Sequence, residues 1–160
     1  MSETCTAVCE PAAEPTAAAP TNAETVCRSV HDHARLEAEK HKWLESEKQG
    51  CDAGAQAIED WYRHFWGKYC RSRRLEHLAG ECQWAEFADD EFGQMYQLLQ
   101  SGNDLLHDLI QRFEQGWENL QFAVWLHETK KPREEVEQIL GLLEIININI
   151  ARLEPRLQVG

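Results

Sequence analysis

Apolar residues recur every three or four positions along most of the chain after residue 28, which is the spacing of one face of an α-helix. The clearest such stripe predicts a helix from about Asp104 to Glu128. It consists of Leu106, Leu109, Ile110, Phe113, Trp117, Leu120 and Val124. A second stripe predicts a helix that Asp52 caps and Gly80 ends. It consists of Ile58, Trp61, Tyr62, Phe65 and Tyr69, and we expect Ile58, Trp61, Phe65 and Tyr69 to lie in the core.

Capping residues mark the ends of the other predicted helices. Ser29 begins a first helix that Gly50 ends, and Asp89 or Asp90 begins a third that extends to about Leu99. Pro132 suits the first turn of a last helix. That helix is apolar on two sides, which indicates packing on both. One face is Val136, Ile139, Leu140, Leu143, Ile146, Ile150 and Leu153, and the other is Leu142, Ile145 and Ile148. The alternation at 146–150 also fits a strand, for which the chain offers no mate.

The first 28 residues differ from the rest. They are rich in Ala, Pro, Thr and Glu, with no aromatic residue and no period, so they predict a disordered tail. The length that remains suits one domain. We therefore expect residues 29–155 to form an all-α bundle of four to five helices behind this N-terminal tail.

The sequence predicts a cytoplasmic protein without membrane contact. No stretch approaches the roughly 18 to 20 consecutive apolar residues of a membrane span, and Glu3 stands where a secretory signal carries Lys or Arg. Cytoplasmic thiols are usually reduced, so all six cysteines are expected to be free. They are Cys5, Cys9, Cys27, Cys51, Cys70 and Cys82. Cys70, near Lys68 and Arg71, is either a reactive thiol or a buried, inert one.

The formal net charge of −12 argues against general attraction to nucleic acid or anionic membranes. Its distribution is uneven. Five cationic residues and no acidic one lie between Trp61 and Leu75, whereas nine acidic residues accompany Arg112 alone in 81–118. The basic cluster is either paired with this acidic segment inside the fold or available to a partner.

Six residues of the second predicted helix are the candidate binding site. They are Arg63, Trp66, Arg71, Arg73, Arg74 and His77. Guanidinium groups beside aromatic rings suit carboxylates, phosphates and acidic protein surfaces. Trp66 lies roughly 140° around the helix from Trp61, so we expect it to be exposed as an interface anchor. A small anionic ligand held between Trp and Arg side chains is a further possibility.

A metal site is the alternative chemistry. Glu37, His41 and Glu45 follow at intervals of four and share one helix face, and Glu76 with His77 could complete a set for iron or manganese. The Glu-x-x-His pairs of di-iron bundles are absent, however. Acidic and basic residues at this spacing also serve simply as solvated support for a helix.

The segment HKWLESEKQGCDAGAQAIEDW, residues 41–61, resembles a pattern found in uncharacterised bacterial helical proteins. The resemblance brings no known activity with it. The sequence also holds no phosphate-binding glycine loop, nucleophile elbow or paired CxxC motif, which disfavours the common enzyme classes.

The sequence therefore predicts a non-enzymatic cytoplasmic interaction or regulatory module without a cofactor. We expect it to self-associate as a homo-oligomer, and to contact an acidic or other protein partner through its Arg- and Trp-rich second helix and its two-faced last helix. The alternative function is a helical-bundle oxidase or metal store that binds iron or manganese.

Overall fold

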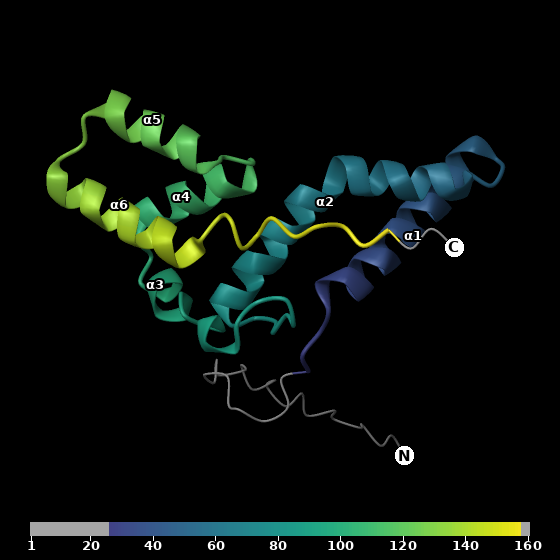
Figure 1. Cartoon of the computed structure of the whole chain (residues 1–160), viewed down its shortest axis with the longest axis horizontal. Coiled ribbons are helices and arrows are strands. Elements are labelled where there is room, and N and C mark those ends of the chain that lie inside the picture. The colour runs from purple at the N-terminus through teal and green to yellow at the C-terminus, as the bar shows by residue number, and fades with distance from the viewer. Residues whose placement is uncertain (1–25, 158–160) are drawn as a thin grey trace, which may run out of the picture.

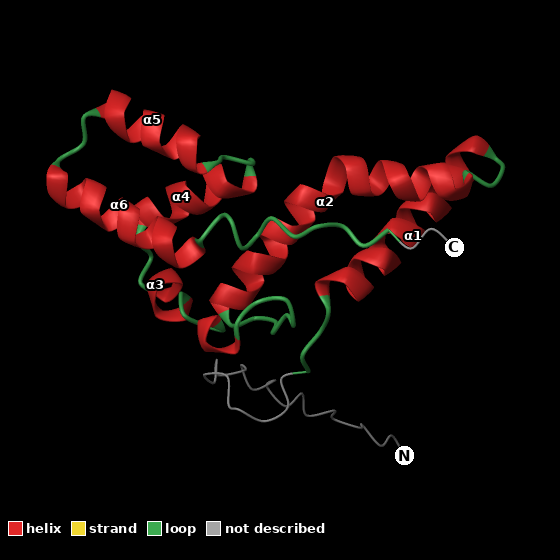
Figure 2. Cartoon of the chain, viewed as in Figure 1, coloured by secondary structure: helices red, strands yellow, loops and turns green. Residues whose placement is uncertain are grey.

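The computed structural model describes residues 26–157, and every regular element in that range is a helix (Figure 2). The all-α prediction is confirmed, although six α-helices replace the predicted four to five. They are α1 (Val30–Gln49), α2 (Gly54–Ala79), α3 (Tyr96–Gln100), α4 (Asp104–Glu114), α5 (Asn119–Thr129) and α6 (Arg133–Ile146), with one 3₁₀ turn at Asp89–Glu91. None of these helices is long and apolar enough to cross a membrane.

The predicted N-terminal tail, residues 1–28, falls almost entirely outside the described residues. The exception is residues 26–28, which the structure describes. The Arg28 N–H donates to the Gln83 carbonyl (3.0 Å), and the Ala85 N–H donates to the Arg28 carbonyl (2.8 Å). This isolated parallel pairing joins the start of the described chain to the loop after α2. The ordered domain therefore includes Arg28, which the predicted boundary left out.

Helix α1 has both of its predicted caps and α2 has its predicted C-cap, whereas Ala53, rather than Asp52, is the N-cap of α2. The Ser29 hydroxyl accepts from the Asp32 N–H at the start of α1, and Gly50 ends that helix in the left-handed conformation. Asp52 accepts from the Gly54 N–H (3.0 Å) just before α2. Gly80, with a φ of 75°, ends α2, and a Cβ at this position would lie 3.2 Å from the Cα of Gly93. Both backbone conformation and space therefore favour glycine there.

Helix α2 runs through the middle of the molecule and belongs to both halves of the fold (Figure 1). Its first half pairs with α1 as a helical hairpin, whereas its second half contacts α3, α4 and α6. We call the hairpin of residues 35–69 the arm. The far end of the arm projects away from the other helices in Figure 1.

Two clusters of buried apolar side chains lie along α2. One consists of Leu78, Met95, Leu106, Leu109, Phe113, Phe122, Ile139, Leu142, Ile146, Ile148 and Ala151. The other consists of Val30, Ala34, Ala38, Trp61, Trp66, Cys70, Trp84 and Phe87. No residue from 39 to 56 is buried, so the far end of the arm contributes to neither cluster.

The predicted helix 104–128 is wrong as a single element. Helix α4 ends at Glu114, and Gly116 then adopts a φ of 94°, which favours glycine and breaks the helix. Helix α5 starts anew from a capping box in which Glu118 and Gln121 each bond the backbone of the other. The stripe therefore does not continue, and Leu120 is 74% exposed.

The predicted third helix is also interrupted. Only the 3₁₀ turn Asp89–Glu91 and the short α3 form, because Phe92 and Gly93 leave the helical conformation. The Gly93 and Met95 N–H groups instead donate to the carbonyls of His77 and Leu78 (both 2.9 Å). This loop therefore caps the end of α2.

The last helix ends earlier than predicted. Asn147 adopts a φ of 47° after Ile146. Residues 148–151 then form turns and residues 152–157 are irregular. Ile139, Leu142 and Ile146 are buried, while Leu140 is 52% exposed. We call residues 147–157 the C-terminal segment. It leaves α6, crosses α2 and runs toward α1 (Figure 1).

Candidate functional site

The arginine- and tryptophan-rich side of α2 is largely buried. Of the six residues predicted to form a binding surface, only Arg63 belongs to the exposed class, and Arg73 is partly buried. The expectation that Trp66 is exposed is wrong, since only 6% of it is accessible. Its indole Nε1 donates to the carbonyl of Leu153 (2.7 Å). The C-terminal segment therefore covers this tryptophan.

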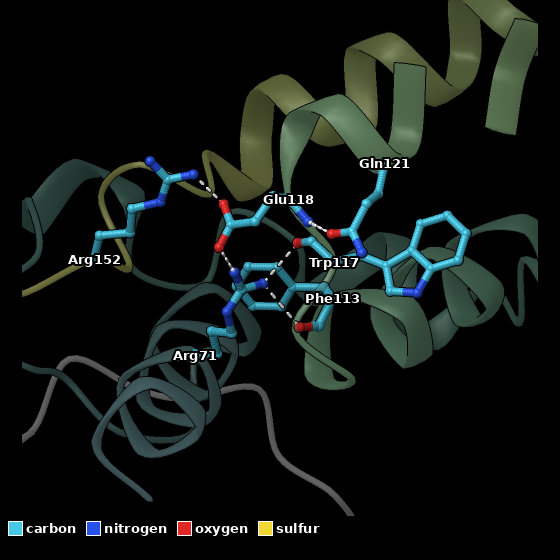
Figure 3. A network of polar contacts seen from close by, with 6 residues as sticks. All are labelled: Arg71, Phe113, Trp117, Glu118, Gln121 and Arg152. Carbon is cyan, nitrogen blue, oxygen red and sulfur yellow. Dashed lines mark hydrogen bonds and ion pairs between the residues drawn. The ribbon is translucent and has the colours of Figure 1, made fainter. Parts of the chain in front are cut away.

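Arg71 is buried at the break between α4 and α5 (Figure 3). Its Nη1 donates to the carbonyls of Phe113 and Trp117 (both 2.9 Å), and its Nη2 pairs with Glu118 Oε1 at 2.5 Å. Arg152 of the C-terminal segment pairs with the other oxygen of Glu118. Arg71 thus stabilises the turn that divides the predicted long helix.

Arg74 is fully buried and joins α2 to the end of α6. Its Nε and Nη2 donate to the carbonyls of Ile146 (3.0 Å) and Ile145 (3.2 Å). Its two Nη atoms also hold the Glu91 carboxylate at 2.7 and 3.2 Å. This pairing lowers the pKa of Glu91 below its ordinary value. A cation at the C-terminal end of α6 also matches the partial negative charge of that helix end.

His77 is fully buried and serves the backbone with both ring nitrogens. Its Nε2 donates to the Ala88 carbonyl (2.9 Å), and its Nδ1 accepts from the Trp84 N–H (3.1 Å). Burial is the main cause that lowers the pKa of His77 below 6.5, and the nearby Arg74 acts in the same direction. The neutral imidazole is therefore the form that fits this site.

Arg73 is held against aromatic rings by a carboxylate. Its guanidinium lies 4.7 Å from the ring centre of Tyr69 and 5.5 Å from that of Trp84. Glu76 pairs with Arg73 through one oxygen (2.9 Å) and accepts from Trp84 Nε1 through the other (3.1 Å). The predicted proximity of arginine and aromatic rings is present, but it lies within one chain.

The basic and acidic segments of the sequence do meet within one chain. Arg71 pairs with Glu118 and Arg74 pairs with Glu91. The guanidinium groups of Arg71 and Arg74 are therefore paired internally, and they do not form the open cationic surface that the sequence predicted. The sequence could not reveal this, because the partner carboxylates lie 47 and 17 positions away. Arg73 pairs with Glu76 but keeps its buried Nε without a hydrogen-bond partner, and it lines the groove described below.

The five residues of the metal alternative are not brought together. They are Glu37, His41, Glu45, Glu76 and His77. Glu37 pairs with Lys40 and Glu45 with Lys48, each at 2.7 Å along α1. His77 has no ring nitrogen left for a metal. Across residues 26–157, no group of three His, Cys, Asp or Glu side chains could hold a metal ion. These charges instead support the helices that carry them.

The sequence left Cys70 as either a reactive thiol or a buried, inert one, and the structure shows it buried. It is 1% exposed, and burial raises its pKa to about 12, so the nucleophilic thiolate is disfavoured. Cys27 and Cys51 are free and exposed. Cys5 and Cys9 lie outside the described residues.

An aromatic groove of about 570 Å³ lies between α1, α2 and the end of α4. Three aromatic side chains of α2, spaced by four residues, line it: Trp61, Phe65 and Tyr69. Its rim carries both signs of charge, including Glu37 and Lys68. The sequence placed Phe65 in the core, but it is 45% exposed. Helix α4 reaches the arm only with its last turn, so nothing in the described chain fully covers the ring of Phe65.

Further large apolar side chains of the arm are accessible. Leu36, Trp43 and Leu44 are 56%, 63% and 49% exposed. Helical spacing places Leu44 on the side of α1 that carries Glu37 of the groove, whereas Leu36 and Trp43 lie on the side turned away from α2. No signal in the hydrophobic pattern distinguished these residues from core positions. The sequence did show the four-residue spacing of Trp61, Phe65 and Tyr69 on α2, but that spacing indicated burial in the core.

Comparison of the chain with protein-family models, with curated proteins and with solved structures found no match.

Proposed function

We propose that the chain is a non-enzymatic cytoplasmic interaction or regulatory module that contacts a protein partner through α2. The contact face is the aromatic side of that helix, rather than the arginine side. The observation that carries the proposal is the groove of about 570 Å³ lined by Trp61, Phe65 and Tyr69. Phe65 is left 45% exposed inside a recess, which is how an interface presents an anchoring site.

The composition of the groove supports a protein partner. Tyr, Trp and Phe are enriched at the buried centres of protein interfaces, and a rim of mixed charge surrounds such centres. Glu37 and Lys68 provide such a rim here. Arg71 and Arg74 contribute indirectly, because they hold α4 and α6 in place against α2.

The last two helices offer a weaker alternative surface. Leu120 and Val124 of α5 and Leu140 of α6 are 74%, 46% and 52% exposed. These side chains are aliphatic, and Leu and Val are under-represented among the residues that dominate binding energy. The two-faced last helix that the sequence predicted as a contact surface is therefore the lesser candidate.

Affinity capture tests the proposal with matched variants. The tagged chain is immobilised, a native cell extract is passed over it, and the retained proteins are identified by mass spectrometry, further copies of the chain included. We expect Phe65→Asp to lose the retained partner, because it places a charge in the aromatic recess. Leu120→Asp introduces the same charge at an exposed site on α5, and this variant should still capture the partner. The same retained proteins in both variants would refute the proposal.

A small anionic ligand is a second candidate for the same groove. Its volume lies within the roughly 300–1,000 Å³ of small-molecule sites. Lys68 and Arg73 line it beside Trp61, so a carboxylate or phosphate with an aromatic ring could pair and stack. Titration with nucleotides and aromatic acids should then quench tryptophan fluorescence saturably. Lys68→Glu should abolish that quenching, and an unsaturable signal in the wild type would exclude this candidate.

A further inference from the structure

The far end of the arm lacks a core of its own. No residue from 39 to 56 is buried, and Trp43 and Leu44 are 63% and 49% exposed. A helical hairpin buries its apolar side by packing against another layer of structure, because most helical stability in proteins comes from such packing. Among the described residues, nothing supplies that layer at the end of the arm.

Leu44 and the groove lie on one side of the arm. Leu44 follows Glu37, which lines the groove, by seven residues, so the two share a helix face. They are separated by about 10.5 Å along α1. Consider a two-fold axis that lies between two copies, perpendicular to α1 and level with the midpoint between Leu44 and Glu37. Such an axis would set Leu44 of each copy against the groove of the other. The surface therefore combines a projecting apolar side chain with a recess in a self-complementary arrangement.

The charge of the arm permits two copies to approach. Residues 35–69 contain seven acidic and six cationic residues, and so carry only one of the twelve net negative charges of the chain. Two carboxylates of α1 near the contact are already paired within the chain. The Nζ of Lys40 lies 2.7 Å from Glu37, and that of Lys48 lies 2.7 Å from Glu45. With a net charge of only minus one on each arm, strong repulsion does not oppose the contact. A nearly neutral surface also gives a strongly charged partner no advantage.

We infer that the protein partner of the arm is a second copy of this chain, an inference that rests on the function proposed above. The two arms pack antiparallel into a four-helix bundle, with Leu44 of each copy against Phe65 in the groove of the other. The arm of each copy thereby supplies the missing layer for the other.

Sedimentation equilibrium of the full chain under reducing conditions tests this inference. We expect a mass of 18.5 kDa at low concentration that approaches twice this value as concentration rises. Leu44→Glu should raise the dimer dissociation constant by at least about tenfold. Leu36→Glu is the matched control, with the same change on the same helix at a comparably exposed leucine facing away from α2. It should leave the constant unchanged. Far-ultraviolet circular dichroism and urea midpoints check that both variants fold.

Each other outcome overturns the inference. A wild-type chain that stays at 18.5 kDa at every concentration excludes the dimer. A dimer that survives Leu44→Glu, or that Leu36→Glu dissociates equally, excludes this contact surface. If the wild type is monomeric while Phe65→Asp still abolishes capture of another protein, the proposed function stands and only the identity of the partner is wrong. If Leu44→Glu leaves the dimer intact and Phe65→Asp leaves partner capture intact, both proposals are wrong.

Discussion

Arg71 Nη2 lies 2.5 Å from Glu118 Oε1, although the two residues are 47 positions apart in the chain (Figure 3). The same guanidinium donates to the carbonyls of Phe113 and Trp117, at the end of one helix and the approach to the next. A buried cation on α2 thus sets the direction in which α5 leaves α4.

Replacement of Arg71 by methionine should destabilise the fold by about 2–4 kcal/mol. The loss arises because two backbone carbonyls and a carboxylate lose their donor at once. Urea denaturation at neutral pH measures the free energy of unfolding. Arg63→Met removes an exposed arginine from the same helix and should change this free energy by less than about 0.5 kcal/mol. Equal values for the two variants would show that the Arg71 contacts contribute little.

Two glycine-to-alanine substitutions should act in opposite directions. Gly116→Ala should cost about 1–2 kcal/mol, because the φ of 94° at this position is unfavourable for a residue with a Cβ. Gly141→Ala should gain about 0.5–1 kcal/mol, since Gly141 lies inside α6 with open space around its Cα. Thermal and urea unfolding compare the pair. A stabilising Gly116→Ala would mean that α4 and α5 can join into one helix.

Stability should fall as the pH drops below about 6.5. The folded state lowers the pKa of His77 beneath the 6.5 of a free histidine, so the unfolded chain takes up the proton first. The full contribution is thus present above this pH and is lost as the pH falls toward the lowered value. His31, whose pKa burial also lowers, acts in the same direction. Urea unfolding at about pH 7.5 and about pH 5.5 measures the difference.

His77→Asn is the informative variant for this pH dependence. It should be less stable than the wild type at both pH values, yet lose less stability between them. A wild-type free energy that is the same at both would contradict the prediction. At still lower pH, Glu91 should add a second loss, because its folded pKa is lowered below 4.5. Its contribution is fully present above 4.5 and is lost as the pH falls from there through the lowered value.

Cys70 should resist alkylation until the chain unfolds. Its thiol is 1% exposed and its pKa is raised to about 12, so little thiolate forms at neutral pH. Iodoacetamide labelling followed by peptide mass spectrometry should modify the exposed Cys27 and Cys51 in the native protein. Modification of Cys70 should require urea. The backbone of Leu153 lies within hydrogen-bond distance of the Cys70 thiol. Equal labelling of Cys70 and Cys51 in the native state would therefore indicate that the C-terminal segment opens readily.

The elements that the sequence predicted correctly depend on local signals. Ser29 and Gly50 bound α1, and Gly80 ends α2, because caps act over a few residues and need no distant partner. The helix break at Gly116 also had local signals, a glycine and the Glu118–Gln121 capping box. The regular apolar spacing outweighed them in the prediction.

The candidate site was harder to predict because a charged residue there is buried and an apolar residue is exposed, the opposite of the usual pattern. Arg74 is fully buried and meets carbonyls 71 and 72 positions away, a pairing that no periodicity encodes. Phe65 fits a core stripe and yet remains 45% exposed, because no other described element packs fully against that part of α2. Only the placement of α4, α6 and the C-terminal segment determines which side of α2 is covered.

The C-terminal segment contains no helix, but it covers part of the second cluster. The carbonyl of Leu153 accepts from the Trp66 indole, and Ala151 and Ile148 are buried nearby in the first cluster. A chain cut after Ile146 would keep the residues of all six helices while it uncovered a tryptophan and the Cys70 thiol. Helix content is therefore a poor measure of whether this protein is intact. Shortened variants and carboxyl-terminal fusions should be judged by the emission wavelength of tryptophan and by thiol reactivity.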